Sequence, residues 1–261
     1  MRLTTFASGS SGNCALLRLD GTNLLLDAGI SWKRICGHLR LSGVAPEALS
    51  AVLITHAHSD HICGLATLVK RCSAPILAPA VVASQLRRSV AGIEARLRVT
   101  EPGESIELEG LCLRCFPTPH DTPESVGWRV TGSEVFALAT DMGCVTEDIR
   151  RGLLGADAVL IEANHDVDRL RYGPYPASLK RRVLSDHGHL SNDDCARLAA
   201  ELASGGTKYI ILGHLSRENN TPALALSTVS AALGGTEGLF VAPADERLTL
   251  ETGEEAALCS P

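Results

Sequence analysis

The sequence predicts an α/β protein, and two observations carry this expectation. Short apolar segments rich in Val, Ile and Leu recur along the 261-residue chain and are typical of strands. Helical stretches accompany them, and the strands fall into two successive runs. Periodicity alone indicates only the α/β class. Two runs of strands, each with its own helices, fit two sheets packed face to face with helices outside, which is a four-layer α/β/β/α sandwich.

The expected elements follow in chain order. In the first half, apolar or alternating segments predict strands at 14–19, 23–29, 51–56, 75–79, 96–100, 105–117, 126–130 and 135–141, with helices around 31–41, 62–72 and 79–91. In the second half, strands are expected at 157–164, 208–214, 239–243 and 247–251, and helices at 175–185, 191–206 and 221–235. The clearest helix begins after Ser191 as N-cap, with Asp194 at the third position and glycines at its end.

Length and composition narrow the function classes. We expect one domain over residues 1–261, with ample length for a sizeable core. No apolar run approaches the roughly 18 residues of a membrane span, and the N-terminal stretch lacks the continuous apolar core of a signal peptide. A cytoplasmic protein is therefore expected. The net charge of −6 argues against indiscriminate binding of nucleic acid but leaves room for local basic patches.

The nine cysteines do not predict a disulfide framework, because their number is odd and no export signal is present. Cys112 and Cys115 form a C-x-x-C pair, but the alternating pattern around them sends the two sulfurs to opposite faces of a strand. No second such pair completes four ligands, so a zinc ribbon is disfavoured.

A histidine-rich turn follows the apolar strand at 51–56. His56, His58, Asp60 and His61 stand within six residues, and imidazoles and carboxylates are the ligands that divalent transition metals prefer. The alternative is a polar turn whose histidines cap a helix, with Asp60 or Ser59 as N-cap. A buried strand that ends in H-x-H-x-D-H favours the metal interpretation.

Four ligands do not complete two metal sites, and further candidates stand at the ends of other predicted strands. They are His120, Asp141 and His214. Each alone has an ordinary explanation as a strand-end histidine or a capping aspartate. Together and in this order they predict a composite metal centre.

The ordered set resembles the metallo-β-lactamase fold superfamily across nearly the whole chain, from Asp27 in "LLLDAG" through "THAHSDH" to "LGHLS". The resemblance implies two divalent ions, Zn²⁺ or Mn²⁺. It places His56, His58 and His120 around one ion and Asp60, His61 and His214 around the other. It also makes Asp141 the bridging ligand and Asp27 a carboxylate that orients the ligand loop. An aspartate rather than a cysteine at Asp141 resembles the phosphodiesterase branches.

Several segments, among them "SGSSGNC", "IEANHD" and "LGHLSRENN", are similar to the YycJ (WalJ) branch. This similarity implies a DNA exonuclease acting 5′ to 3′, a dinuclear phosphodiesterase that uses a metal-bridging hydroxide. The nearest alternative is a small-molecule hydrolase on the same scaffold, which cleaves a cyclic phosphate, a thioester or a lactone. A metal- or redox-sensing protein is a third possibility, disfavoured because no cysteine belongs to the ligand pattern. The native metal, the strand preference and the oligomeric state stay open.

His189 is the candidate general acid, guided by a related segment in the tRNA 3′-processing endonucleases. Glu162, at the end of the strand at 157–164, could hold and charge its imidazole. The ordinary alternatives are a loop histidine and a strand-end carboxylate, and His187 could substitute for His189. The predicted catalytic residues are thus Asp60, Glu162 and His189.

Three further polar groups could belong to the site. Ser8, Ser10 and Asn13 could offer backbone N–H groups to a phosphate or simply form a tight turn. A second group could line the cleft: Asn164, His165, Asn219 and Asn220. The cluster Lys180, Arg181 and Arg182 could follow a nucleic-acid backbone, although a solvated helix face is the commoner reason for such a cluster.

Overall fold

The computed structural model describes residues 1–252, and positions 253–261, the end of the predicted domain, lie outside the described residues. The chain forms two compact units. Among the described residues, unit 1 contains Met1–Cys115, Thr131–Glu134 and residues 243–252, and unit 2 contains Phe116–Val130 and Val135–Ala242. The expectation of a single domain over 1–261 stays a prediction.

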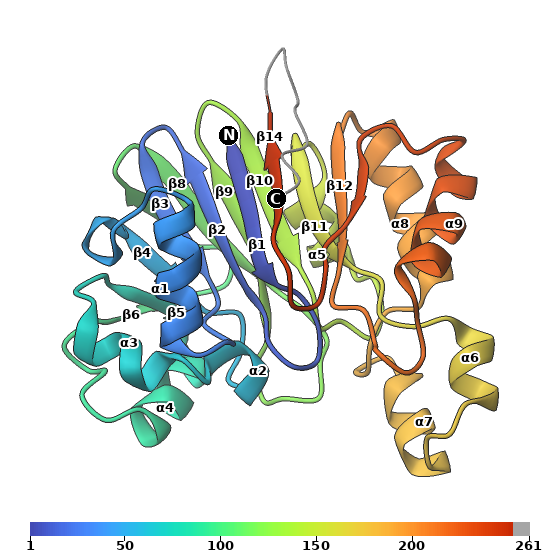
Figure 1. Cartoon of the computed structure of the whole chain (residues 1–261), viewed down its shortest axis with the longest axis horizontal. Coiled ribbons are helices and arrows are strands. Elements are labelled where there is room, and N and C mark those ends of the chain that lie inside the picture. Colours follow the sequence, from blue (N-terminus) through green and yellow to red (C-terminus); the bar gives the residue numbers. More distant parts are fainter. Residues whose placement is uncertain (253–261) are drawn as a thin grey trace. The chain divides into compact units, whose positions relative to one another are not determined.

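The first sheet lies in unit 1 and has the strand order β14-β1-β2-β3-β4-β5-β6 (Figure 1). Its strands are β1 (Arg2–Ala7), β2 (Cys14–Leu19), β3 (Thr22–Leu26), β4 (Ala51–Leu53), β5 (Ile76–Pro79), β6 (Leu97–Thr100) and β14 (Leu248–Glu251). The pairs from β14 to β3 are antiparallel, and those from β3 to β6 are parallel. The parallel strands therefore end at one common edge of the sheet.

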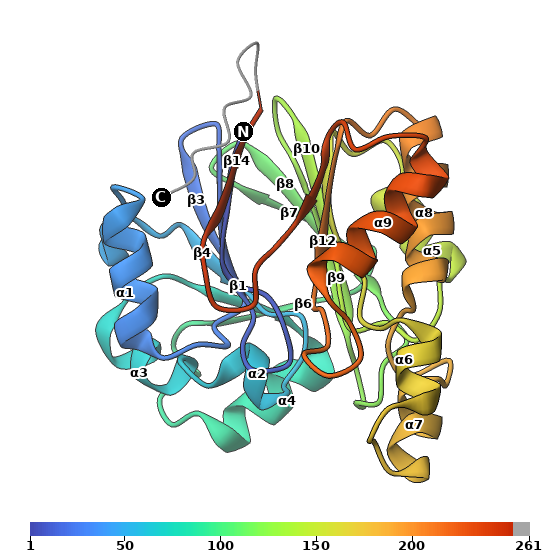
Figure 2. The ribbon, with the colours of Figure 1, turned by 45° about the vertical axis from the view of Figure 1, so that its right-hand side comes forward.

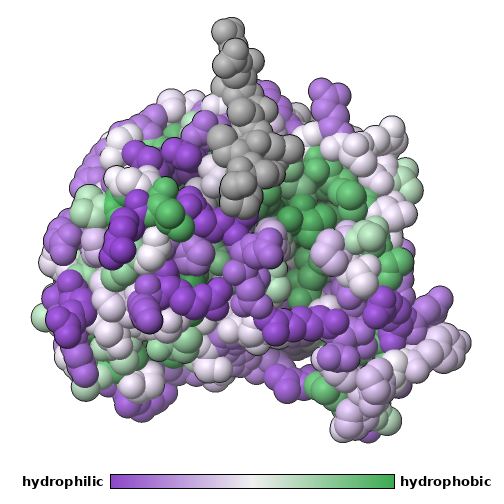
Figure 3. Space-filling view, viewed as in Figure 1, coloured by the Kyte–Doolittle hydropathy of each residue, from purple (hydrophilic) through white to green (hydrophobic). Residues whose placement is uncertain are grey.

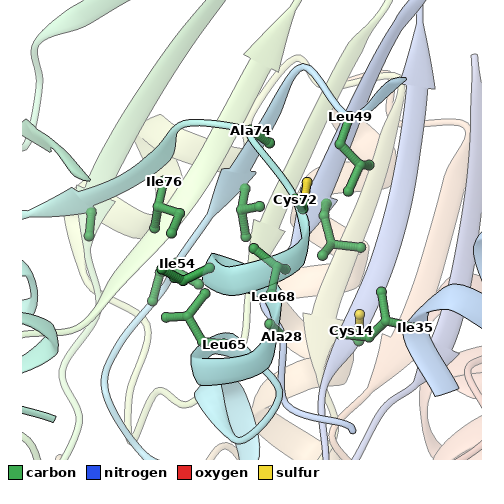
Figure 4. Packing of buried hydrophobic residues seen from close by; sticks show 14 of the residues in the cluster. Cys14, Ala28, Ile35, Leu49, Ile54, Leu65, Leu68, Cys72, Ala74 and Ile76 are labelled. Atoms are coloured by element: carbon green, nitrogen blue, oxygen red, sulfur yellow. The ribbon is translucent and has the colours of Figure 1, made fainter. Parts of the chain in front are cut away.

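The helices of unit 1 connect the parallel strands. They are α1 (Trp32–Leu41), the 3₁₀ turn η1 (Pro46–Ala48), α2 (Ser59–Ile62), α3 (Leu65–Arg71) and α4 (Ala80–Ser89). In Figure 4, Leu65 and Leu68 of α3 lie beside Ile54, which follows β4, and they share one apolar cluster with Cys72 and with Ile76 of β5. This apolar layer fixes the start of α2 and α3, and with them the turn that carries the histidines.

The second sheet has the order β13-β12-β11-β10-β9-β8-β7. Its strands are β7 (Ser105–Leu108), β8 (Leu111–Pro117), β9 (Val126–Thr131), β10 (Val135–Ala139), β11 (Ala158–Glu162), β12 (Tyr209–Gly213) and β13 (Leu239–Val241). Strands β10 to β13 are parallel. Their carboxyl ends meet at one edge, which is where functional residues of parallel sheets gather.

Unit 2 contains five helices among the described residues: α5 (Glu147–Leu153), α6 (Val167–Tyr172), α7 (Ala177–Val183), α8 (Asn192–Ser204) and α9 (Pro222–Leu233). Residues of α5, α8 and α9 join Val159, Ile161 and Leu212 of the strands in one apolar cluster. Helices α6 and α7 contribute nothing to this cluster and lie side by side away from the strands (Figures 1 and 2).

The structure confirms the α/β class, with helices beside two mixed sheets, and most expected elements. Ser191 caps α8, and its hydroxyl accepts a hydrogen bond from the Asp194 N–H. The expected strand at 105–117 is instead two strands, β7 and β8, because Glu109 and Gly110 form a turn with positive φ angles. Strand β1 and helices α5 and α6 were not expected.

Two expectations drawn from composition can be compared with the described residues. None of their helices is long and apolar enough to cross a bilayer. The cysteines of residues 1–252 are all free thiols, so no disulfide framework forms in this part of the chain.

Candidate metal centre

The histidine-rich turn of unit 1 joins β4 to α2, and its side chains converge. His56 and His61 are completely buried. The ring of His56 lies 4.6 Å from that of His58 and 4.1 Å from that of His61, measured between centroids. The Oδ2 atom of Asp60 lies 3.5 Å from Nε2 of His61. The four residues that the sequence singled out are therefore neighbours within unit 1.

Asp27 orients this turn through its contacts with His61 and Thr55. Its Oδ2 atom lies 2.8 Å from Nδ1 of His61. The backbone N–H and the hydroxyl of Thr55 both donate to the same carboxylate, at 2.9 Å each. A carboxylate that accepts from one imidazole nitrogen sets the tautomer and turns the other nitrogen toward a ligand position. Asp27 thus makes the contact that its predicted orienting role requires.

The glycine-rich loop before β2 supports the same turn, and the sequence did not indicate this. The Asn13 N–H donates to the Asp60 carbonyl oxygen at 2.7 Å, and the Asn13 side chain lies 2.9 Å from Nε2 of His61. Gly29 packs so closely that a Cβ atom there would lie 1.7 Å from the Asp60 oxygen. A pattern of Gly and Asn predicts a turn but not this tertiary contact; only the coordinates show it.

In unit 2 the candidate residues stand at the ends of four strands. Asp141 follows β10, Glu162 ends β11, His214 follows β12, and His120 follows β8. The Asp141 carboxylate lies 3.2 Å from Nδ1 of His214 and 3.6 Å from Nε2 of His120. Ligand atoms of Asp141, Glu162, His189 and His214 all lie within 4.8 Å of one another. The parallel register of β10, β11 and β12 brings these side chains to one edge.

Three of the candidate residues adopt a left-handed backbone conformation. The φ angles are 56° at Asp27, 58° at Asp141 and 54° at His214. Side chains other than glycine avoid this region, and such residues cluster at functional sites where the surrounding structure holds them. Each of the three stands within two residues of the end of a buried strand.

Glu162 and His189 form the pair that the sequence suggested. Oε1 of Glu162 lies 2.7 Å from Nδ1 of His189, and Oε2 accepts the N–H groups of Met142 and Leu190 at 2.9 and 3.3 Å. Both carboxylate oxygens accept hydrogen bonds, an arrangement that fits a group orienting His189. His187, the alternative to His189, is exposed.

The surroundings of His189 keep its imidazole charged. Burial lowers its pKa, but the charge of Glu162, the hydrogen bond to it and the nearby Asp141 outweigh burial and raise the pKa to about 9. At neutral pH the ring is an imidazolium with protons on both nitrogens. Since Nδ1 is bound to Glu162, the proton on Nε2 is the one that a reacting group can receive.

His120 is held in the neutral form that binds metals. Its Nδ1 lies 3.1 Å from the carbonyl oxygen of Gly188, and burial is the main cause that lowers its pKa. Gly143 makes the neighbouring loops approach closely, because a Cβ there would lie 2.4 Å from the Asp186 oxygen. The backbone of the His189 loop thus orients His120.

The asparagines that could line the cleft are buried, and two of their side-chain amides donate to backbone oxygens. The Asn164 amide donates to the His214 carbonyl oxygen at 2.9 Å, and the Asn220 amide donates to the Ala163 oxygen at 2.8 Å. Asn219 bonds to Ser216, and His165 is buried with a pKa lowered by burial to about 4. These residues fix the segments after β11 and β12 that carry the candidate ligands.

The donor chemistry of both units fits divalent metal ions. Each unit offers buried imidazoles beside a carboxylate, and Asp141 is only 2% exposed. Burying a carboxylate is costly without a cation or donors around it. Nitrogen and carboxylate donors are those used by Zn²⁺ and Mn²⁺ in proteins. The division of the ligands between two ions stays a prediction.

Comparison with known proteins gives a consistent picture. The family model described as the beta-lactamase superfamily domain matches residues 22–215. The chain is 38% identical over 232 residues to the exodeoxyribonuclease WalJ of Streptococcus pneumoniae, covering 87% of this chain and 86% of WalJ. It is 34% identical over 235 residues to the exodeoxyribonuclease YycJ of Bacillus anthracis, covering 89% of each.

Among solved structures, the metallo-β-lactamase fold protein YhfI of Bacillus subtilis superposes with a TM-score of 0.72 at 17% identity. The match covers 95% of this chain and 99% of YhfI. At this identity the likeness concerns the fold, and it confirms the expected α/β sandwich class. This fold implies a site for divalent metal ions. The chain belongs to the β-lactamase superfamily and is a hydrolase of the metallo-β-lactamase fold.

Proposed function

We propose that this hydrolase is a dinuclear metal-dependent phosphodiesterase that digests DNA as an exonuclease, in the 5′ to 3′ direction. The names of the two relatives, at 34% and 38% identity over most of the chain, support a nuclease. The observation that carries the proposal is the Glu162–His189 pair beside Asp141, because phosphodiester cleavage needs a charged acid next to the metal ligands.

The proposed ligand sets are those that the family resemblance implies. His56, His58 and His120 would hold one ion, Asp60, His61 and His214 the other, and Asp141 both. Bound divalent ions supply an activated water and positive charge opposite the phosphoryl oxygens. Asp60 counts as catalytic in this scheme because it would be one of the ligands that hold the water-activating ions.

The protein's own groups carry the proton steps. The imidazolium of His189 donates its Nε2 proton to the oxygen that leaves phosphorus, and Glu162 keeps the ring charged and correctly turned until that moment. Asp27 performs the corresponding task for His61 by binding its Nδ1 atom. Neither carboxylate needs to change its protonation state during turnover.

The test is digestion of duplex DNA that carries a label at either the 5′ or the 3′ end, with Mn²⁺ or Zn²⁺ present. We expect early release of labelled mononucleotide from the 5′-labelled strand and gradual shortening of the 3′-labelled strand. The opposite pattern would reverse the proposed polarity. Turnover of bis(p-nitrophenyl) phosphate or a thioester without any digestion of DNA would replace the nuclease by the small-molecule hydrolase.

The proposal includes a cytoplasmic location, because the two relatives are exonucleases of bacteria and the chromosome of a bacterium lies in its cytoplasm.

A further inference from the structure

Helices α6 and α7 with their connection, residues 166–186, form a segment that we name the α6–α7 arm. It carries five cationic side chains, Arg169, Arg171, Lys180, Arg181 and Arg182, and three acidic ones, so its net charge is +2 in a chain of net charge −6. In the space-filling view, hydrophilic and pale residues cover this end of unit 2, with few hydrophobic ones (Figure 3). The arm is therefore positively charged, whereas the protein as a whole is negatively charged.

Few of these five cations form ion pairs with carboxylates in the part of the chain that the structure describes. Among the residues that the structure describes, Arg182 is the one cation of the arm that pairs with a carboxylate, that of Asp121. Arg169 and Lys180 donate to the backbone oxygens of Glu218 and Arg171, at 3.4 and 2.8 Å. A backbone oxygen leaves the full charge of the ammonium or guanidinium group available to an anion in the surrounding water.

The tip of the arm presents an aromatic ring to solvent. Tyr172, the last residue of α6, is 86% exposed, the largest exposure among the large apolar side chains of residues 1–252. The turn that follows requires Gly173, where a Cβ would lie 2.4 Å from the Arg169 oxygen. An aromatic ring with no packing role, set among cations, is the arrangement on which nucleic-acid bases stack.

The base of the arm is continuous with the candidate catalytic loop. The Val183 oxygen accepts the His189 N–H at 3.0 Å. A Cβ at Gly188 would lie 2.2 Å from the Val183 oxygen, so helix and loop touch without room for a side chain. Asp121, the partner of Arg182, lies 3.3 Å from Nε2 of His120. Helix α7 therefore contacts His189 directly and His120 through Asp121.

We propose that the α6–α7 arm binds backbone phosphates of the DNA strand that enters the site, with Tyr172 stacking on a base of that strand. This inference rests on the proposed nuclease function and adds the surface that holds the substrate. Helix α7 has seven residues and is about 10 Å long at about 1.5 Å per residue. At about 3.4 Å per nucleotide along one strand, it spans about three phosphates.

The experiment measures equilibrium binding of fluorescently labelled DNA by anisotropy, in chelator, so that no strand is cut. The test variant is R171Q/R181Q, and the matched control is R87Q/R88Q on α4 of unit 1, where both arginines are exposed. Both double variants change the net charge equally. We expect Kd to rise at least about tenfold in the arm variant alone. The slope of log Kd against log salt concentration should fall by about one for each arginine removed.

A second variant, Y172A, tests the stacking. Because the ring is exposed, its removal leaves the fold unchanged, and we expect about a tenfold loss of affinity for DNA. Equal affinities of arm variant, control and wild type would overturn the proposal, as would equal losses in arm variant and control. An arm variant that loses affinity equally for DNA and for an acidic polypeptide such as polyglutamate would point to an acidic protein partner and also overturn it.

The outcome is separable from that of the proposed function. If the wild-type protein binds DNA through the arm but does not digest it, the nuclease function is refuted and the DNA-binding surface stands. If the wild-type protein digests DNA and the R171Q/R181Q variant digests it with the same KM, the nuclease function stands and the binding role of the arm is refuted.

Discussion

The two units supply their candidate ligands in different ways. In unit 1, His56, His58, Asp60 and His61 come from one turn of six residues, held by Asp27 and Asn13. In unit 2, each residue comes from a separate strand end, and parallel pairing of β10, β11 and β12 brings three of those ends to one edge. The unit 1 residues are brought together because they are close in the sequence, and the unit 2 residues because of the order of the strands in the sheet.

This difference decides how each set responds to change. The turn of unit 1 depends on close backbone contacts, such as Gly29 against the Asp60 oxygen. The strand ends of unit 2 are held by a large apolar cluster and by asparagines that bind their backbone. Substitutions around unit 1 ligands should therefore shift several ligands together, whereas those in unit 2 should leave the neighbouring strand ends in place.

The largest effect is expected from Asp141→Ala. Asp141 contacts both His120 and His214, so its loss should remove metal as well as rate. Loss of several kcal/mol of charge stabilisation corresponds to a fall in turnover of at least about 10⁴-fold. Metal content by atomic emission and the rate of DNA digestion check this. Wild-type turnover or full metal content in the variant would contradict the bridging assignment.

His189→Ala should separate acid catalysis from metal binding. We expect turnover to fall by about 10²- to 10³-fold, within the range for a general acid, while the metal content stays that of the wild type. A metal-depleted variant would show that His189 is a ligand. His187→Ala, at the exposed neighbouring histidine, is the matched control and should keep the wild-type rate.

Asp27→Asn tests the local support of unit 1. The amide keeps the shape but no longer offers two acceptor oxygens to Thr55 and His61. Loss of a carboxylate that orients a ligand lowers metal affinity about 10- to 100-fold. Titration with a metal chelator measures this. An unchanged affinity would mean that the backbone of the turn, rather than Asp27, orients His61.

Glu162→Gln has the smallest effect at neutral pH and the clearest effect on the pH profile. With the pKa of His189 raised to about 9, activity that needs the imidazolium persists until the pH rises through about 9. Without the carboxylate the pKa falls, so the alkaline limb should move to lower pH, toward the ordinary value of about 6.5. The same raised pKa stabilises the fold below about pH 6.5, and this contribution is lost as the pH approaches 9.

The rate of DNA digestion against pH for wild type and E162Q gives the measurement. An alkaline limb at the same pH in both proteins would show that another group titrates there. Thermal unfolding of the two proteins near pH 7 serves as the control for folding.

The same contrast explains what the sequence could predict. The H-x-H-x-D-H turn is visible as a local pattern, and the ends of the β10, β11 and β12 strands follow from their apolar runs. Helix α8 was predicted through its Ser191 cap. That Asp141 and His214 lie 3.2 Å apart depends on strand order, which no local pattern contains. The family resemblance supplied that step.

Misses arose where local signals were short or ambiguous. Strand β1 has only six residues, and its adjacent threonines interrupt the apolar pattern. Helix α5 carries Thr146 as cap and two acidic residues in its first turn, signals that were present but span only seven residues. The contacts of Asn13 and Gly29 with Asp60 depend on tertiary packing and have no sequence signature.

The left-handed backbone at Asp27, Asp141 and His214 has an evolutionary consequence. A residue with a side chain is less stable there than glycine by roughly 1–2 kcal/mol. A duplicated gene released from selection for hydrolysis would relieve this strain by drifting to glycine at Asp141 or His214, whereas glycine at Asp27 would also lose the bonds to Thr55 and His61. Retention of Asp and His at such positions in a descendant therefore marks a lineage that still performs chemistry, and glycine marks a retired copy.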